Sequence, residues 1–263
     1  MDSVGDGRPC TVVYVSSPPF LLLPPSEGKE VGGVKGNDKG VFSQTLRDDR
    51  KTVISQVRDL LENSNPKVLE KTLGVRGPLL ERTIESMTQL VEGRAPVLPA
   101  YQRYSGVVWN NLDPSTLSAE QRKQIVIPSG LYGVTTAEDM IADYRLKMNI
   151  SLAEIGNVAK FWQPSLTKCL RAHLLGSVVL NLLPKEHGRA IDLQSLSEVA
   201  RVVTVEFVGA NGTQAAGHDA KAVKGVVARV LLANGLDGLV GFRWNGWKAK
   251  EKSGQWKISA PKE

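Results

Sequence analysis

Apolar residues along this chain follow two kinds of pattern: short continuous runs and longer stretches with helical spacing. Runs of three to six apolar residues begin near residues 20, 125 and 178, and a proline follows each of them. Short runs of this kind are typical of buried strands. Residues 199–208 alternate and are rich in β-branched side chains, which predicts a further strand. Apolar positions at intervals of three or four predict helices over residues 42–61, 67–73, 78–91, 152–175 (interrupted near Pro164) and 218–233.

The order of these elements, in which strands alternate with helices, predicts an α/β fold. We expect a single compact domain over residues 20–250, built on a mixed β-sheet that is flanked by helices. Residues 239–250 are expected to add a final pair of strands. Residues 1–19 are expected to be a loose leader, and residues 251–263 a C-terminal tail.

The stretch from Ile125 to Met148 combines a strand end, a glycine loop and a predicted helix start. Gly130 and Gly133 bracket a loop that needs unusual backbone angles. Thr135 and Glu138 have the spacing of a capping box, which predicts a short helix from this point. Junctions of this kind commonly place functional groups at the rim of an α/β sheet. A structural junction with solvated charges is the alternative.

Residues 67–91 form a predicted αα-hairpin, in which a loop over residues 74–77 joins two helices. Pro78 suits the first position of the second helix. The arrangement resembles a helix-hairpin-helix, whose loop amides bind a DNA phosphate without reading bases. Two residues separate the loop glycines, where the usual motif has one, so a plain αα-hairpin is the alternative. The cations that would attract DNA here are Lys67, Lys71, Arg76 and Arg82.

The composition is that of a soluble globular protein with a basic excess. Of its 263 residues, 41% are hydrophobic and 23% are charged, and the net charge of +6 favours a polyanionic partner. Cys10 and Cys169 lie far apart and have no metal-binding or disulfide spacing, which indicates a reducing compartment. No apolar run approaches the ~20 residues of a membrane span, and residues 1–19 lack a basic signal region. We therefore expect a cytoplasmic protein that has no membrane partner.

The polar loop after the first predicted strand, at residues 24–29, allows several interpretations. Ser26 and Lys29 have the S-x-x-K spacing of serine acyl-transfer enzymes, but the companion S-D-N and K-T-G motifs are absent. The G-x-x-x-x-G-K pattern of a Walker A loop is absent as well. Two interpretations remain. The loop binds a phosphate through its amides, hydroxyl and ammonium group, or it is a proline-stiffened turn with solvated charges.

Two further groups of side chains invite a functional interpretation. Residues 101–109 interleave aromatic side chains with Arg103, a pattern that suits stacking on an unpaired base or anchoring in the core. His187 next to Glu186 could be a proton-transfer pair or half of a metal site. The chain has only three histidines and no zinc motif. We therefore expect a surface or loop histidine, and we predict neither a metal nor a cofactor.

Five segments, in the same order along the chain, together resemble the YaaA family of bacterial peroxide-stress proteins. They are LLPPSEGK at 22–29, RYSGVVW at 103–109, SGLYGV at 129–134 with YRL at 144–146, VVLNLLPKEH at 178–187 and KAVKGVVAR at 221–229. The resemblance extends over nearly the whole chain. It implies the family's fold, called the cantaloupe fold, with a DNA-binding helix-hairpin-helix. It also implies protection during hydrogen peroxide exposure, lower unincorporated iron, and DNA binding through a positively charged cleft.

The chain departs from the pattern of this family at two points. The family has K-K-A-R-G where residues 221–225 read KAVKG, so that Lys224 stands in place of an arginine. Because lysine lacks the bidentate geometry of arginine, phosphate binding here would change. At His187 the family more usually has an aromatic residue.

Most of these segments follow predicted strands, so their loops are expected to converge on one basic cleft. The residues expected to line it are Ser26, Ser129, Tyr132, Tyr144 and Asn181. The residues expected to bind nucleic acid are Lys29, Lys67, Lys71, Arg76, Arg82, Arg103, Arg145, Lys221, Lys224 and Arg229.

Three functions follow from these observations. The first is a DNA-binding stress protein that contacts the backbone of duplex or structured DNA. The alternative is an enzyme of unknown reaction that acts on a small or nucleic-acid substrate. Direct iron sequestration fits least, because histidines and cysteines are few and the carboxylates lack a recognisable ligand spacing. The candidate catalytic residues are Glu27, Lys29, Asp143 and Glu186.

Overall fold

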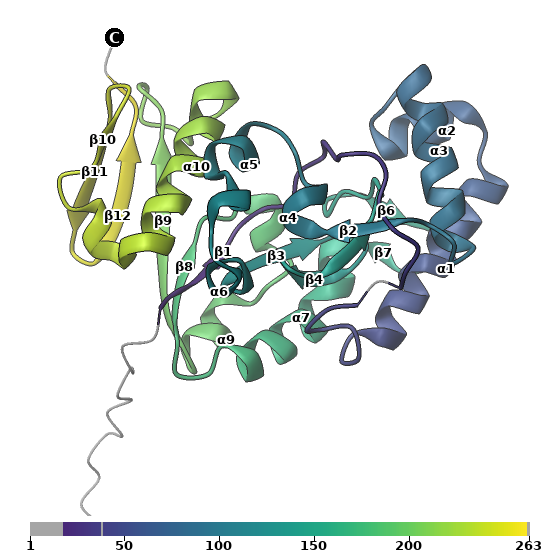
Figure 1. Ribbon diagram of the computed structural model, residues 1–263, viewed down its shortest axis with the longest axis horizontal. Helices are drawn as coiled ribbons and strands as arrows, with labels where there is room; N and C mark the ends of the chain where they lie inside the picture. Colours follow the sequence, from purple (N-terminus) through teal and green to yellow (C-terminus); the bar gives the residue numbers. More distant parts are fainter. Residues whose placement is uncertain (1–17, 38, 262–263) are drawn as a thin grey trace, which may run out of the picture.

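A mixed sheet of eight strands runs through the protein in the order β10-β11-β12-β9-β8-β1-β3-β4 (Figure 1). The computed structural model describes residues 18–37 and 39–261, so the expected leader falls almost entirely outside the described residues. The strands of the sheet are β1 (Phe20–Leu22), β3 (Ile125–Ser129), β4 (Gly133–Thr136), β8 (Val178–Asn181), β9 (Arg201–Val208), β10 (Arg243–Trp244), β11 (Trp247–Lys252) and β12 (Gln255–Ser259). Two small ladders accompany it, β2 (Val97–Pro99) with β5 (Met140–Ala142) and β6 (Ser151–Leu152) with β7 (Gly156–Asn157).

The centre of the sheet is parallel. Strands β3, β1, β8, β9 and β12 run in one direction, and β4 and β11 are antiparallel to their neighbours. Leu21 of β1 pairs with Ile125 of β3 and with Leu180 of β8. All three side chains are buried, which explains why these strands are continuous apolar runs in the sequence. Because parallel strands end at the same edge of a sheet, the loops after β1, β3, β8 and β9 lie along one edge.

Helices cover the sheet on both sides, so the prediction of a mixed sheet flanked by helices is confirmed. In Figure 1, α5 and α10 lie on one side and α7 and α9 on the other, while α1 to α3 lie at the end remote from β10 to β12. The helices are α1 (Arg47–Asn63), α2 (Pro66–Leu73), α3 (Pro78–Val91), α4 (Ala100–Arg103), α5 (Val107–Leu112), α6 (Ala119–Lys123), α7 (Val158–His173), α8 (Lys185–Gly188), α9 (Leu193–Ser197) and α10 (Gly217–Asn234), with 3₁₀ turns η1 (Pro114–Thr116) and η2 (Gly235–Leu239).

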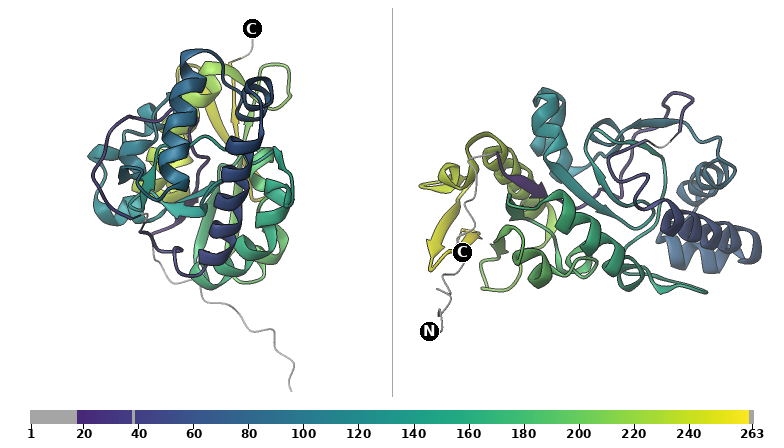
Figure 2. Two further views of the ribbon diagram at one scale, coloured as in Figure 1. Left: turned by 90° about the vertical axis from the view of Figure 1, so that its right-hand side faces the viewer. Right: turned by 90° about the horizontal axis from the view of Figure 1, so that it is seen from below.

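The predicted αα-hairpin is present as α2 and α3, which Figure 2 shows from the end of the molecule. Gly74 ends α2 in the left-handed region with a φ of 67°, a conformation that favours glycine. Pro78 occupies the first turn of α3, where its missing N–H costs nothing. Between them Val75 is buried and fixes the loop against the core.

The helix predicted from Thr135 is absent, and that prediction is wrong. Residues Thr135 and Thr136 belong to β4, where they pair with Ile127 and Val126 of β3. The Thr136 hydroxyl donates to Asp139 at 2.6 Å and closes the turn that leads into β5. The β-branched residues of β4 are therefore used for strand pairing rather than for a helix cap.

Three other boundaries differ from the predictions. The expected helix over 152–175 begins only at Val158, because the preceding residues form the β6–β7 hairpin, and it continues through Pro164. Helix α1 likewise begins later than expected, at Arg47. Residues 251–259 form no tail, because β12 pairs in parallel with β9.

Candidate functional site

A cleft of about 1290 Å³ lies at the carboxyl ends of the parallel strands. The chain passes from β1 to β3 on one side and later crosses to β8 on the other side of β1. Such a reversal of strand order separates the two loops and opens a crevice between them, where α/β proteins commonly bind ligands. Here the loops over residues 24–29 and 181–189 form its walls, together with the start of α10.

The lining of the cleft is basic. Among the residues that line it, four are carboxylates, namely Glu27, Glu186, Asp192 and Glu206. Eight are cations, namely Lys29, Arg145, Lys147, Lys185, Arg189, Lys221, Lys224 and Lys257. This excess favours an anionic ligand.

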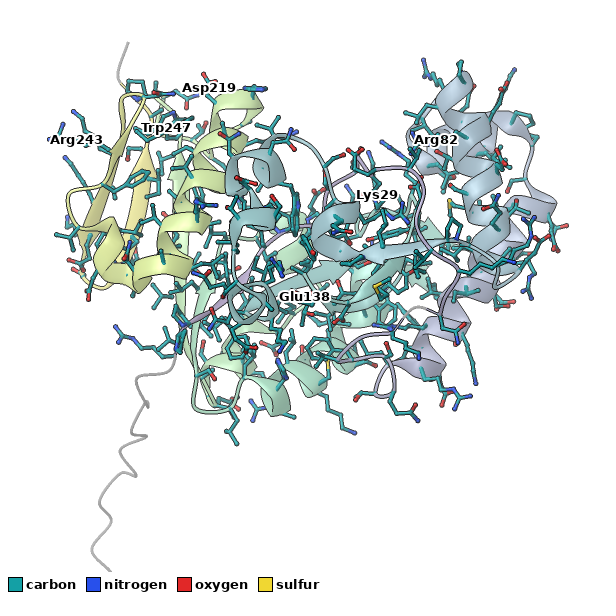
Figure 3. The ribbon with its side chains drawn as sticks, viewed as in Figure 1. Lys29, Arg82, Glu138, Asp219, Arg243 and Trp247 are labelled. Carbon is teal, nitrogen blue, oxygen red and sulfur yellow. The ribbon has the colours of Figure 1, made fainter. Side chains whose placement is uncertain are left out.

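Lys29 projects from the loop after β1, near Arg82 of α3 (Figure 3). Its amine donates to the Ser26 carbonyl at 2.8 Å and lies 4.2 Å from the centre of the Tyr144 ring. Burial lowers the pKa of Lys29 to about 7, and nearby Asp143 opposes that shift. The Ser26 hydroxyl donates instead to the Ser105 carbonyl. The amine–hydroxyl contact of an S-x-x-K acyl-transfer site is therefore missing.

Glu27 forms ion pairs with two of the cleft cations. Its carboxylate lies 2.7 Å from the Arg145 guanidinium and 3.0 Å from the Lys147 amine. Arg145 also donates to the carbonyl of Leu73, the last residue of α2, at 3.1 Å. The cleft rim and the αα-hairpin are thus joined through one side chain.

Asp143 and Arg82 form a second link between the hairpin and the cleft. The Arg82 guanidinium lies 2.9 Å from the Asp143 carboxylate, and it also donates to the Lys29 carbonyl at 3.2 Å. Both Arg82 and Asp143, which we predicted as a nucleic-acid contact and a catalytic candidate, are therefore engaged with each other.

Three hydroxyl groups, those of Tyr104, Ser129 and Tyr144, form a buried hydrogen-bonded network beneath the cleft. The Tyr144 hydroxyl lies 2.8 Å from that of Tyr104 and 2.7 Å from that of Ser129. Burial raises the pKa of Tyr144 to about 12, so its proton stays in place. The Tyr132 hydroxyl accepts from the Ala142 amide at 2.9 Å. Of this group only Tyr144 reaches the cleft lining, and the others hold the SGLYG loop in position.

The opposite wall of the cleft contains Asn181 and Lys224. The Asn181 side chain bonds the Thr204 hydroxyl and the Leu183 amide, both at 3.1 Å, and so fixes the chain where it leaves β8. The Lys224 amine donates to the Leu182 carbonyl at 2.8 Å. Burial lowers the pKa of Lys224 to about 8.

His187 lies on the same wall, in the short helix α8 within the loop after β8, and its side chain is only 12% exposed. Of the expected surface or loop position, the loop is what the structure shows. The His187 Nδ1 atom lies 3.4 Å from a Glu186 carboxylate oxygen. Burial, helped by the charge of Lys224, lowers the pKa of His187 to about 4. The ring is therefore neutral at neutral pH.

The replacement His187→Phe is expected to flatten the acid dependence of stability. Between pH 6.5 and pH 4 the unfolded chain binds a proton on His187 that the folded protein does not bind. The free energy of unfolding of the wild type should therefore fall by up to about 3 kcal/mol as the pH drops through this window, and the variant should lack this contribution. Urea denaturation between pH 7 and pH 4.5 measures the change, with exposed His218→Phe as the control. Equal pH slopes in the wild type and in His187→Phe would contradict the expectation.

Several residues predicted to bind nucleic acid lie elsewhere. Arg103 is fully buried and donates to backbone carbonyls, a position that favours a structural role over its predicted contact with nucleic acid. Arg229 donates to the Leu112 carbonyl and to the Thr116 hydroxyl, beside α5. Lys67, Lys71 and Arg76 are exposed on the hairpin, outside the cleft.

Sequence reasoning missed four of the cations that line the cleft, Lys147, Lys185, Arg189 and Lys257. A signal was present for Lys147, which stands two residues after Arg145 in an extended segment and so shares its side of the chain. Lys257 reaches the cleft only because β12 pairs with β9.

The fold and the cleft define the class to which this protein belongs: an α/β protein with a basic cleft at the carboxyl ends of parallel strands. A family model described as "Peroxide stress protein YaaA" matches residues 20–253. The chain belongs to the YaaA family of peroxide stress proteins, and the resemblance found in the sequence is confirmed.

Relatives with similar length support this placement. The UPF0246 protein of Streptomyces coelicolor is 30% identical over 227 residues, which cover 82% of this chain and 84% of that protein. The UPF0246 protein of Corynebacterium glutamicum is 32% identical over 223 residues, covering 81% and 84%. A UPF0246 protein of Rickettsia bellii is 26% identical over 212 residues, covering 76% and 84%.

Two further features concern the whole described chain. Within residues 18–37 and 39–261, no helix is long and apolar enough to cross a membrane. Over the same residues, no group of three or more His, Cys, Asp or Glu side chains is arranged to hold a metal ion.

Proposed function

We propose that this protein acts in the response to hydrogen peroxide by binding DNA, and that it contacts the sugar–phosphate backbone. The observation that carries the proposal is the basic cleft, with eight cations against four carboxylates, joined directly to an αα-hairpin. Phosphates dominate the affinity of such an interface, since each neutralised phosphate releases a counterion. Family membership supplies the link to peroxide stress.

The start of α10 supports an anion in the cleft. Gly217 and Ala220 in its first turn line the cleft, and the N-cap residue Ala216 offers no side-chain cap. The free amides of a helix N-terminus carry partial positive charge and bind phosphates. Lys221 lies one turn further and, among the described residues, forms no ion pair.

The α2–α3 hairpin extends the proposed interface as a helix-hairpin-helix. Gly74 and Gly77 both have positive φ angles, so the loop turns tightly. The Gly74 and Val75 amides donate to the Glu70 carbonyl, so the amides that the loop can present are those of Arg76 and Gly77. Arg76 in that loop is exposed, with its nearest carboxylate, Glu70, at 4.0 Å. Amides and cations of this kind bind the backbone and carry no base readout. We therefore propose a preference for DNA structure over sequence.

We also propose, from the family resemblance, that this activity is linked to lower free iron in the cell. The proposed interface consists of cations and backbone amides, which bind phosphates and are not ligands for iron. The link to iron would therefore be indirect.

DNA binding is tested by fluorescence anisotropy with duplex, bulged and single-stranded DNA across a salt series. We expect a steep negative slope of log affinity against log salt, and Lys221→Ala and Arg76→Ala should each reduce its magnitude by about 0.9. Glu27→Gln frees Arg145 and Lys147 and should steepen the slope. Lys168→Ala, an exposed lysine of α7 outside the cleft, is the matched control. Flat, negligible binding to all three DNAs would refute the proposal.

An enzyme is the second candidate function, and the ionisable nitrogens in the cleft favour it. Lys29, Lys224 and His187 all line the cleft, and burial lowers the pKa of each. Lys29 and Lys224, with pKa values of about 7 and about 8, are near the working pH and so are suited to proton transfer and nucleophilic attack, whereas His187, with a pKa of about 4, stays neutral. Among the carboxylates proposed earlier, Glu27 and Asp143 are held in ion pairs, which leaves Glu186 the freer acid or base.

A further inference from the structure

Lys29 lines the cleft but its amine is buried, and a lysine that only attracts phosphate by its charge needs no such burial. Among the described residues, Lys29 forms no ion pair. The two carboxylates nearby are held by other cations: Glu27 by Arg145 and Lys147, and Asp143 by Arg82. A lysine placed for electrostatic attraction alone would be more effective exposed and fully charged.

The surroundings of the Lys29 amine instead suit a nucleophile. One hydrogen bond to the Ser26 carbonyl and the face of the Tyr144 ring hold the nitrogen in place. With a pKa of about 7, half of the amine is neutral at pH 7. That is roughly a thousandfold more neutral amine than an ordinary lysine has at this pH. Neutral amines held in such sites attack carbonyl carbons.

We propose that Lys29 is an amine nucleophile that forms a reversible imine with the aldehyde of a phosphorylated sugar. The cations of the cleft, among them Lys221, would hold the phosphate while Lys29 meets the aldehyde carbon. Two kinds of molecule carry such an aldehyde next to a phosphate: the open-chain sugar at an abasic site in DNA and a free sugar phosphate. The first kind rests on the proposed function, and the second does not.

The reaction balances without a further reactant. The lone pair of the Lys29 nitrogen attacks the aldehyde carbon, and the carbonyl π electrons move to oxygen. A proton passes from nitrogen to that oxygen to give a carbinolamine. The carbon–oxygen bond then breaks, and the oxygen leaves as water with a second proton, so that one aldehyde and one amine yield one imine and one water. A borohydride hydride would reduce this imine to a stable secondary amine.

Borohydride trapping tests the proposal on the full-length protein. The protein is mixed with duplex DNA that contains a single abasic site, with glyceraldehyde 3-phosphate, or with unphosphorylated glyceraldehyde. The covalent adduct is quantified by mass spectrometry and located by peptide mapping. We expect a reductant-dependent adduct on Lys29 from at least one phosphorylated aldehyde, more than about tenfold above glyceraldehyde, with a rate that rises through pH 7.

Lys29→Arg keeps the positive charge but has no nucleophilic amine, and it should abolish the adduct. Lys168→Arg should leave the adduct unchanged. Because the adduct is located in the wild-type protein, the outcome does not depend on how well Lys29→Arg folds. An adduct located on Lys224, or spread over surface lysines, would overturn the proposal.

The two proposals fail separately. DNA binding without any adduct from either phosphorylated aldehyde would overturn the imine and leave DNA binding standing. An adduct from the free sugar phosphate, with no DNA binding, would support the imine and refute the proposed function. An adduct at the abasic site supports both.

Discussion

Arg103→Met is expected to lower the free energy of unfolding by about 3–5 kcal/mol, because it removes the donors of a buried network. The Arg103 side chain is fully buried, and its guanidinium donates to four backbone carbonyls from three segments of the chain. Methionine fills much of the same volume but donates nothing, so each carbonyl would lose its hydrogen bond to the guanidinium. Those carbonyls belong to Glu30, Gly32, Pro96 and Ile141.

Chemical denaturation in urea measures this loss, and Arg94→Met is the matched control. Arg94 is exposed and, among the described residues, forms an ion pair only with Glu92, so its replacement should cost less than about 1 kcal/mol. DNA affinity measured on the folded fraction of Arg103→Met should stay close to that of the wild type. Normal stability together with lost DNA binding would show instead that Arg103 contacts the ligand.

Gly133→Ala is expected to cost about 3 kcal/mol of stability, through two effects that act together. Gly133 has a φ of 72°, where a Cβ atom costs ~1–2 kcal/mol. That Cβ would also lie 2.7 Å from the Trp162 ring, and such overpacking costs a further ~1–3 kcal/mol. Trp162 cannot yield easily, since it is fully buried and its Nε1 donates to the Gly130 carbonyl at 2.8 Å.

Gly156→Ala separates the two effects, because Gly156 has a similar φ of 65° but nothing within 4 Å of the added atom. It should cost about 1 kcal/mol, the backbone contribution alone. Urea denaturation of both variants gives the difference. Equal losses would mean that the Trp162 contact contributes nothing and that the SGLYG loop is held by other groups.

Local features determined the elements that the sequence predicted well. The hairpin helices α2 and α3 were found because Gly74, Pro78 and the spacing of apolar residues act within a few positions of one another. The strands β1 and β8 were found because burial on both faces leaves a continuous apolar run. The convergence of the loops after these strands follows from the same pattern, since parallel strands end at one edge.

Pairing between distant segments decided the elements that the sequence missed. Thr135 and Glu138 match the local pattern of a helix cap. In the structure, however, Thr135 pairs with Ile127 of β3 and so belongs to a strand. Residues 255–259 alternate around Trp256 and Ile258, and they become part of the large sheet by pairing with β11 on one side and with β9, about 50 residues earlier in the chain, on the other. A register between segments depends on the whole fold, so no local window of sequence contains it.

The candidate site shows the same division. The sequence by itself determined which cations are available and that the loops carrying Lys29 and Asn181 meet. Only the tertiary structure decided that Arg103 is buried, that Glu27 pairs with Arg145 from 118 residues away, and that Lys29 forms no ion pair with a described carboxylate. Charge is a property of the residue type. Burial and pairing, which set the pKa and the availability of each group, depend on neighbours that the chain brings together only when it folds.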